Sequence, residues 1–318
     1  MEKDGYACPL GARPVDLAAF APLQGYRVEF EPADGDDEEG EWEEWPDRYM
    51  FDVVITHTRV EALARACYAL LPGRVYPILD ILGNDEYREV DPYIAYDAVG
   101  IERFIDALRR HRGWFYDDGM VGFGAMSIEP FVYIYVDEHK ILTIRVEVAL
   151  RERVEKILQA FDLQPVEEPL GVDSVEHEHL SALVAPEDRP DLLMMEEIID
   201  ELRSQWRLEL NIDPDENVDD DGAPLGVTCW RCVAGRRREG DGPEEMLVVL
   251  LAAPSLSDAE RLTLDTLQND DQTVESVEIL AADRITPGSF AALLGREPEG
   301  LLEAARVWDV RRVDDQTD

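Results

Sequence analysis

The first residues that suggest chemistry are the cysteines of Cys229-Trp230-Arg231-Cys232. Two thiolates three residues apart can bind one zinc ion, but a structural zinc site needs four ligands. His177 and His179 would complete such a set, although a predicted helix separates them from the thiols. In a regular strand, Cys229 and Cys232 would point to opposite faces, which hinders shared ligation. A zinc site and a pair of buried structural thiols are therefore alternative interpretations.

An acidic loop, 213–222, offers oxygen ligands instead. Read from position 217, it places Asn217, Asp219 and Asp221 at alternate positions and a glycine directly after them. Alternating oxygens followed by glycine resemble the opening of a calcium-binding loop. Position twelve of that loop is Thr228 and not the bidentate glutamate, and 71 acidic residues make chance matches common. A calcium site and a solvated hairpin loop both remain open.

His57 lies where a predicted strand, 50–55, passes into a predicted helix. Ligand-binding residues often occupy such junctions, and Asp80 on the next predicted strand would orient the imidazole for catalysis. A loop histidine beside a helix start is the alternative. His139, in a predicted hairpin turn, and His111, among arginines, are expected on the surface.

Other recognised catalytic motifs are absent from the sequence. It contains no Gly-Lys dipeptide, no Gly-x-Ser-x-Gly and no His-Glu-x-x-His, which excludes Walker-type phosphate loops, nucleophile elbows and helical zinc proteases of those patterns. His177 and His179 have the wrong spacing for two ligands on one helix. Gly122 and Gly124 share a strand face and permit close approach of a ligand or of packed side chains. No cofactor is predicted beyond the zinc and calcium alternatives.

The composition is strongly acidic. The 318 residues include 30 Lys and Arg against 71 Asp and Glu, a formal net charge of −41. Such a chain repels phosphate backbones and membrane surfaces, so we expect neither nucleic acid nor a membrane as partner. No apolar run approaches the ~18 residues of a membrane span, and the first residues lack signal-peptide features. We therefore expect a cytoplasmic protein.

The elements that must position these residues predict an α+β fold. A helix is expected over 59–71, with a capping box in Thr58 to Glu61. A hairpin is expected between 131–136 and 141–148. We predict a loose N-terminal arm over 1–22, followed by three further segments: a domain over 23–163, a Pro- and acid-rich linker over 164–173, and a second domain over 174–318.

We expect each domain to be a mixed sheet, ferredoxin-like or a related open sheet, with helices packed on one face. One continuous sheet formed by both halves is the alternative. Residues 26–30 resemble 206–210, and 50–71 parallels 246–268. These likenesses favour a weak internal duplication, or they reflect only the shared periodicities of strand and helix.

From this we predict a non-catalytic interaction or regulatory protein that binds a basic protein surface, as a decoy or immunity protein does. Charge complementarity would speed such association. One alternative is a metal-assisted enzyme of unknown reaction that uses His57 with carboxylates, or the Cys229 and Cys232 pair. A further alternative is that the acidity reflects only adaptation to a salty cytoplasm and has no specific function. The sequence leaves the oligomeric state open.

Overall fold

A computed structural model describes residues 1–33, 45–83, 85–182, 195–219, 221–238, 245–269 and 274–313. The chain divides into two compact units. Unit 1 comprises 1–82 and 92–211, and unit 2 comprises 83–91 and 212–318. Both combine helices with antiparallel sheets, which confirms the mixed α and β character of the prediction. The predicted acidic loop at 34–44 lies outside the described residues.

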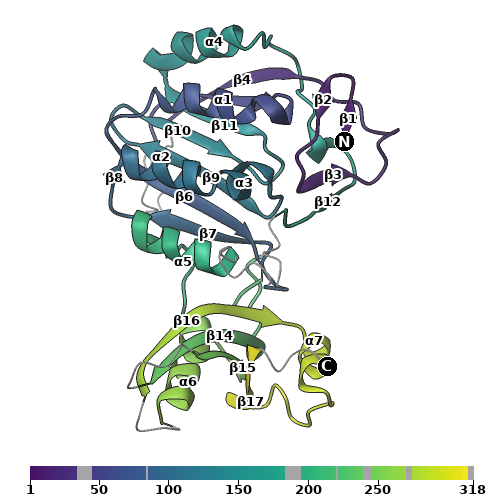
Figure 1. Ribbon diagram of the computed structural model, residues 1–318, viewed down its shortest axis with the longest axis vertical. Helices are drawn as coiled ribbons and strands as arrows, with labels where there is room; N and C mark the ends of the chain where they lie inside the picture. The colour runs from purple at the N-terminus through teal and green to yellow at the C-terminus, as the bar shows by residue number, and fades with distance from the viewer. Residues whose placement is uncertain are drawn as a thin grey trace. The chain divides into compact units, whose positions relative to one another are not determined.

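Unit 1 is built on one large sheet with the strand order β13-β7-β6-β9-β10-β11-β5-β4, and β8 pairs with β6 (Figure 1). The predicted hairpin is confirmed as β10 and β11, which pair in antiparallel register. The strands are β4 (Gly25–Glu31), β5 (Arg48–Val54), β6 (Arg74–Leu82), β7 (Val90–Ala95), β8 (Val99–Gly100), β9 (Val121–Ser127), β10 (Val132–Val136), β11 (Leu142–Glu147) and β13 (Leu208–Leu210).

The helices of unit 1 pack on the apolar face of this sheet. Side chains alternate across a strand, so Val132, Ile134 and Val136 of β10 face the helices while Tyr133 and Tyr135 point away. The buried faces of strands and helices form one continuous core. The helices are α1 (His57–Tyr68), α2 (Ile101–Arg110), α3 (Arg112–Asp117), α4 (Arg151–Ala160) and α5 (Met195–Trp206), with a 3-10 turn η1 at Val148–Leu150.

A second, smaller group of residues, 1–20 and 172–182, packs beside the large sheet (Figure 1). We call it the N-terminal layer. The expectation of a loose arm is wrong, because buried residues of the layer form an apolar cluster with Val54 of β5: Tyr6, Cys8, Ala12, Phe20 and Val172. Its elements are β1 (Glu2–Lys3), β2 (Tyr6–Ala7), β3 (Ala12–Pro14), β12 (His177–His179) and a 3-10 turn η2 (Val172–Ser174).

The segment predicted as a linker, 164–173, lies inside unit 1. The Tyr26 amide donates to the Gln164 carbonyl, and the Val166 amide donates to the Tyr26 carbonyl. Backbone bonding therefore attaches this segment to β4. The division between the compact units falls between residues 211 and 212 instead.

Unit 2 contains a four-stranded antiparallel sheet of order β16-β14-β15-β17. Its two helices lie on opposite faces of this sheet, since Cys229 of β14 packs with Phe290 of α7, whereas Cys232 lies beside Thr263 of α6. The prediction that the helices pack on one face is therefore wrong for this unit. The element order does not confirm a ferredoxin-like fold. The elements are β14 (Thr228–Arg238), β15 (Glu245–Ala253), β16 (Val274–Ile285), β17 (Arg306–Arg312), α6 (Leu256–Asn269) and α7 (Pro287–Leu294).

Candidate metal centre

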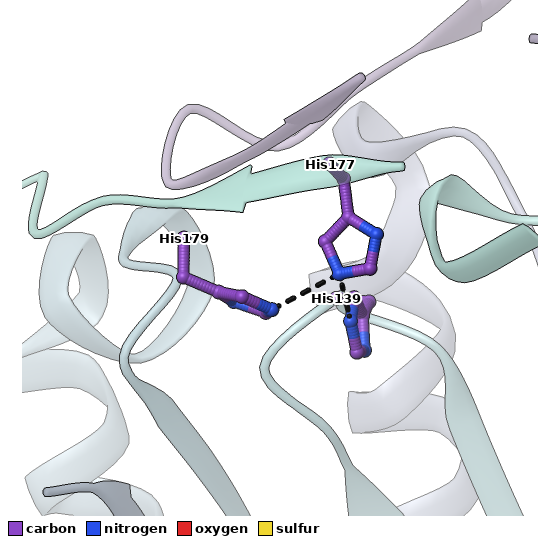
Figure 2. Close-up of side chains that lie close together, drawn as sticks. All are labelled: His139, His177 and His179. Carbon is purple, nitrogen blue, oxygen red and sulfur yellow. Dashed lines mark hydrogen bonds between the residues drawn. The ribbon is translucent and has the colours of Figure 1, made fainter. Parts of the chain in front are cut away.

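Three histidines of unit 1 converge on one point (Figure 2). The Nε2 atom of His177 lies 2.8 Å from Nε2 of His139 and 3.1 Å from Nε2 of His179. His177 and His179 lie two residues apart in β12 and therefore share a face of that strand. His139 comes from the turn between β10 and β11. Two separate parts of the unit thus supply the three rings.

The other nitrogen of each ring faces a hydrogen-bond acceptor. Nδ1 of His177 lies 2.7 Å from the Val175 carbonyl, and Nδ1 of His179 lies 2.8 Å from the Gly119 carbonyl. Nδ1 of His139 lies 3.3 Å from a carboxylate oxygen of Asp137. Carbonyl and carboxylate oxygens only accept, so each Nδ1 carries the hydrogen. In the neutral rings, every Nε2 then presents a lone pair to the centre.

Lone pairs directed at one another repel, and a cation among them removes that repulsion. Zinc binds imidazole nitrogen at about 2.0–2.1 Å, which places two ligands of a tetrahedral site about 3.3 Å apart. The observed separations of 2.8 and 3.1 Å are close to that value. Imidazole suits zinc, copper, iron and nickel. The geometry and the donor set therefore fit a divalent transition-metal ion.

Carboxylates surround His139 and add negative potential. Oε1 of Glu138 lies 3.3 Å from His139 Nδ1, the same distance as the Asp137 oxygen. Burial lowers the pKa of His139, but Asp137, Glu138 and Asp173 outweigh burial and leave that pKa above its usual value. Burial lowers the pKa of His179, which its bond to Gly119 offsets only in part. A carboxylate behind a ligating imidazole is a common arrangement in metal sites.

The hairpin turn fixes the position of His139. The Lys140 amide donates to the Asp137 carbonyl, and the Ile141 amide donates to Oδ1 of Asp137. Lys140 adopts a positive φ of 66°, and its buried ammonium donates to the Val121 carbonyl at 2.7 Å. Burial lowers the pKa of Lys140 to about 8. His139 is held inside this structure with a side chain only 13% exposed, so the expectation of a surface residue is wrong.

Strand β12 is held in place by the start of the chain. His177 lies opposite Pro14 and His179 opposite Ala12 in the antiparallel pairing of β12 with β3. A Cβ at Gly11 would lie 1.9 Å from the Gly119 nitrogen, so the two backbones approach as closely as only glycine permits. Just beyond β12, the buried Asp118 accepts hydrogen bonds from Ser181 and Ala182.

His57 and Asp80 have separate partners. Nε2 of His57 lies 2.7 Å from the Tyr116 carbonyl and 3.1 Å from an Asp117 oxygen. Oδ2 of Asp80 instead accepts a 2.5 Å hydrogen bond from the Tyr135 hydroxyl. Burial raises the pKa of Asp80, although the Tyr135 bond opposes it. Asp117, not Asp80, is therefore the carboxylate that orients His57.

The two cysteines of unit 2 lie on opposite faces of β14, as described above. Both are buried free thiols, and burial raises the pKa of Cys229 to about 11 and of Cys232 to about 12. Neither belongs to a group of potential metal ligands among the described residues. His177 and His179, proposed to join them, lie with His139 in unit 1.

The predicted calcium ligands already serve other bonds. The buried Asn217 donates to Gly226 and Thr228 and accepts from Arg284. Oδ1 of Asp219 accepts the amides of Asp221 and Ala223. Within the described part of the chain, neither Asp219 nor Asp221 belongs to a group of three acidic, histidine or cysteine ligands.

Comparison of the chain with protein-family models, with curated proteins and with solved structures finds no match. Among the described residues, none of the helices is both long enough and apolar enough to span a membrane.

Proposed function

We propose that this protein binds one divalent transition-metal ion, such as zinc, through His139, His177 and His179. The convergence of the three Nε2 atoms supports this proposal most directly, because every Nδ1 is already engaged by an acceptor. The nearby acidic side chains Asp137, Glu138 and Asp173 favour a cation electrostatically. The cluster contains three of the five histidines of the chain.

Three histidine ligands are typical of catalytic zinc sites, in which the fourth position holds water or substrate. Zinc held in this way lowers the pKa of bound water to about 7 and polarises carbonyl or phosphoryl oxygens. The arrangement therefore favours the metal-assisted enzyme over the other interpretations. In this proposal the metal ligands are His139, His177 and His179, whereas the sequence suggested His57 or the pair of Cys229 and Cys232. Hydration or hydrolysis is the class of reaction that such a centre supports.

The test is metal binding by protein freed of metal with a chelator. We expect zinc and cobalt to bind at one equivalent, with cobalt giving the visible absorption of a tetrahedral nitrogen-ligated site. His139→Ala, His177→Ala and His179→Ala should each weaken zinc binding by roughly 100-fold or more. His57→Gln removes a histidine outside the cluster and is the matched control. Absence of stoichiometric binding of zinc, cobalt and nickel would refute the proposal.

Binding of a basic protein surface is a second candidate, supported by a hollow in unit 2. The hollow has a volume of about 360 Å³, and Asp85 in its lining is already paired with Arg284. The lining also contains Arg88 and four further acids: Glu86, Glu89, Asp219 and Asp221. A lysine-rich peptide should bind with an affinity that falls steeply with salt. Glu86→Gln with Asp221→Asn should weaken that binding, and equal binding by the double variant would remove this candidate.

A further inference from the structure

The three proposed ligands join two parts of unit 1 that have separate cores. His139 belongs to the β10–β11 hairpin, whose strands lie in the large core. His177 and His179 belong to β12, which pairs only with β3 among the described strands. Residues of the N-terminal layer form their own small cluster around Tyr6, Phe20 and Val172. An ion at the three rings would therefore cross-link the two parts.

Apart from the histidines, hydrogen bonds and one small apolar cluster attach the layer to the rest of unit 1 among the described residues. The Gly11 amide donates to Asp117, and the Gly119 amide donates to Leu180. The Ala7 amide donates to the Thr56 hydroxyl. Ser181 and Ala182 donate to the buried Asp118. The apolar cluster of the layer includes Val54 of β5, and Ile141 of the hairpin packs against it. Attachment by a small cluster and scattered hydrogen bonds is typical of segments that open locally.

The charges at the junction oppose docking when no cation is present. Carboxylates from both parts meet there, because Asp137 and Glu138 belong to the hairpin turn and Asp173 belongs to the layer, and the charge of Asp137 acts on Asp173. The three Nε2 atoms also meet there. Opening of the layer would separate His177 and His179 from His139. A cation reverses the sign of the interaction, because it attracts all three nitrogens at once.

We infer that the metal ion is a reversible clasp that holds the N-terminal layer against the β10–β11 hairpin. This inference rests on the proposed metal binding. An ion that binds only the docked arrangement stabilises it in proportion to the free metal concentration. Metal occupancy would then control how often residues 1–20 and 172–182 open, and with them access to the centre.

Hydrogen–deuterium exchange of the full chain tests the inference, with the chelated protein compared to protein at a buffered free zinc concentration 100 times the measured dissociation constant. Exchange within 5–15 and 174–182 should slow by up to about 100-fold, since opening requires release of the ion. Peptides from α2 and α6 should not change. His179→Ala should abolish the zinc effect, and His57→Gln should retain it.

The outcomes separate the two proposals. Zinc binding at one equivalent without slower exchange in the layer would overturn the clasp and leave the metal site standing. Slower exchange of equal size throughout the chain would also overturn it, because general stabilisation is not a local clasp. Absence of zinc binding would remove both proposals. The wild-type comparison needs no variant, so poor folding of His179→Ala would not weaken the test.

Discussion

At the scale of single residues, Asp137 decides the chemical form of His139. Its Oδ1 accepts the Ile141 amide, while its other oxygen faces His139 Nδ1. The carboxylate therefore fixes the tautomer that directs Nε2 toward His177. Glu138 shares this role at the same distance. Asp137 is a positioning residue, because it acts on the proposed ion only through the imidazole.

Asp137→Asn should lower zinc affinity about 10- to 100-fold without unfolding the protein. The amide oxygen still accepts the Ile141 bond, but the amide nitrogen cannot accept from His139 Nδ1. Competition with a zinc chelator measures the change. Asp97→Asn, at an exposed carboxylate paired with Arg207, is the control and should not alter affinity. Equal affinity of Asp137→Asn and wild type would show that Asp137 is not needed to orient the ring, which Glu138 and the turn backbone then hold.

Asp283 is a second residue whose surroundings have a measurable consequence. Its Oδ2 has no hydrogen-bond partner among the described residues and lies 3.6 Å from Arg231. Burial, reinforced by the charge of Asp91, raises the pKa of Asp283 to about 6. The native state therefore retains a proton that the unfolded chain loses near pH 4. Stability from this group is present below pH 4 and is lost as the pH rises to 6.

Asp283→Asn should therefore stabilise the protein by about 2 kcal/mol at pH 7.5 and leave it unchanged near pH 4. The amide keeps the shape of the side chain and removes the buried charge. Urea unfolding at the two pH values measures the difference. Asp309→Asn is the control. Asp309 is partly exposed and pairs with Arg311, so this variant should show no such pH dependence. A variant less stable than wild type at pH 7.5 would mean that the Arg231 pair dominates.

At the scale of elements, the glycines of β9 serve packing. A Cβ at Gly122 would lie 2.1 Å from the Tyr135 hydroxyl oxygen, and a Cβ at Gly124 would lie 2.3 Å from the Ile134 carbonyl. The Tyr135 side chain therefore lies over Gly122 of the neighbouring strand, where it donates to Asp80. Of the two interpretations of this glycine pair, the structure favours packed side chains.

Gly122→Ala should destabilise unit 1 by about 2 kcal/mol, because the added methyl group displaces Tyr135. Combining it with Tyr135→Phe removes the oxygen that clashes, so the double variant should lose less stability than the sum of the single variants. Denaturant unfolding of all four proteins measures this coupling. Gly73→Ala is the control, since no atom lies within 4 Å of its Cβ position. Equal stability of Gly122→Ala and Gly73→Ala would contradict the packing argument.

Local patterns predicted local elements, and long-range pairing determined the site. The period-two alternation around residues 137–140 predicts the β10–β11 hairpin, and thus the turn that carries His139. The pairing of β12 with β3 joins residues about 165 positions apart, and no local periodicity reports it. The available signal was the His177-x-His179 spacing, which places two imidazoles on one strand face. That spacing is wrong for two ligands on one helix, but it is right for two ligands on one strand.

Helix α1 shows a similar limit at an element boundary. The capping-box pattern at Thr58 to Glu61 predicts a start at residue 59, but the helix begins at His57 with Thr56 at its N-cap. The Thr56 hydroxyl makes no capping bond and instead accepts the Ala7 amide from the N-terminal layer. A tertiary contact thus uses the side chain that a local rule would assign to capping.

At the scale of the whole molecule, the net charge of −41 must be compatible with two compact units. Many described acids are paired, and Glu245 alone contacts Arg236, Arg238 and Arg312. Such pairing offsets only part of an excess of acidic over basic residues that exceeds two to one. The remaining carboxylates repel one another more strongly in the folded chain than in the expanded unfolded chain. Dissolved salt should therefore stabilise the protein.

We expect the free energy of unfolding to rise with potassium chloride between 0.01 and 0.15 M, as the Debye length falls from about 30 to about 8 Å. Urea titrations at fixed salt measure it, with sucrose of equal osmolality as the control for solvent exclusion. The range above 0.15 M separates the explanations of the acidity. Screening alone is nearly complete there, so a plateau leaves the charge available for a basic partner, whereas a further steep rise toward molar salt indicates adaptation to a salty cytoplasm. A flat response below 0.15 M would show that local ion pairs already neutralise the self-repulsion.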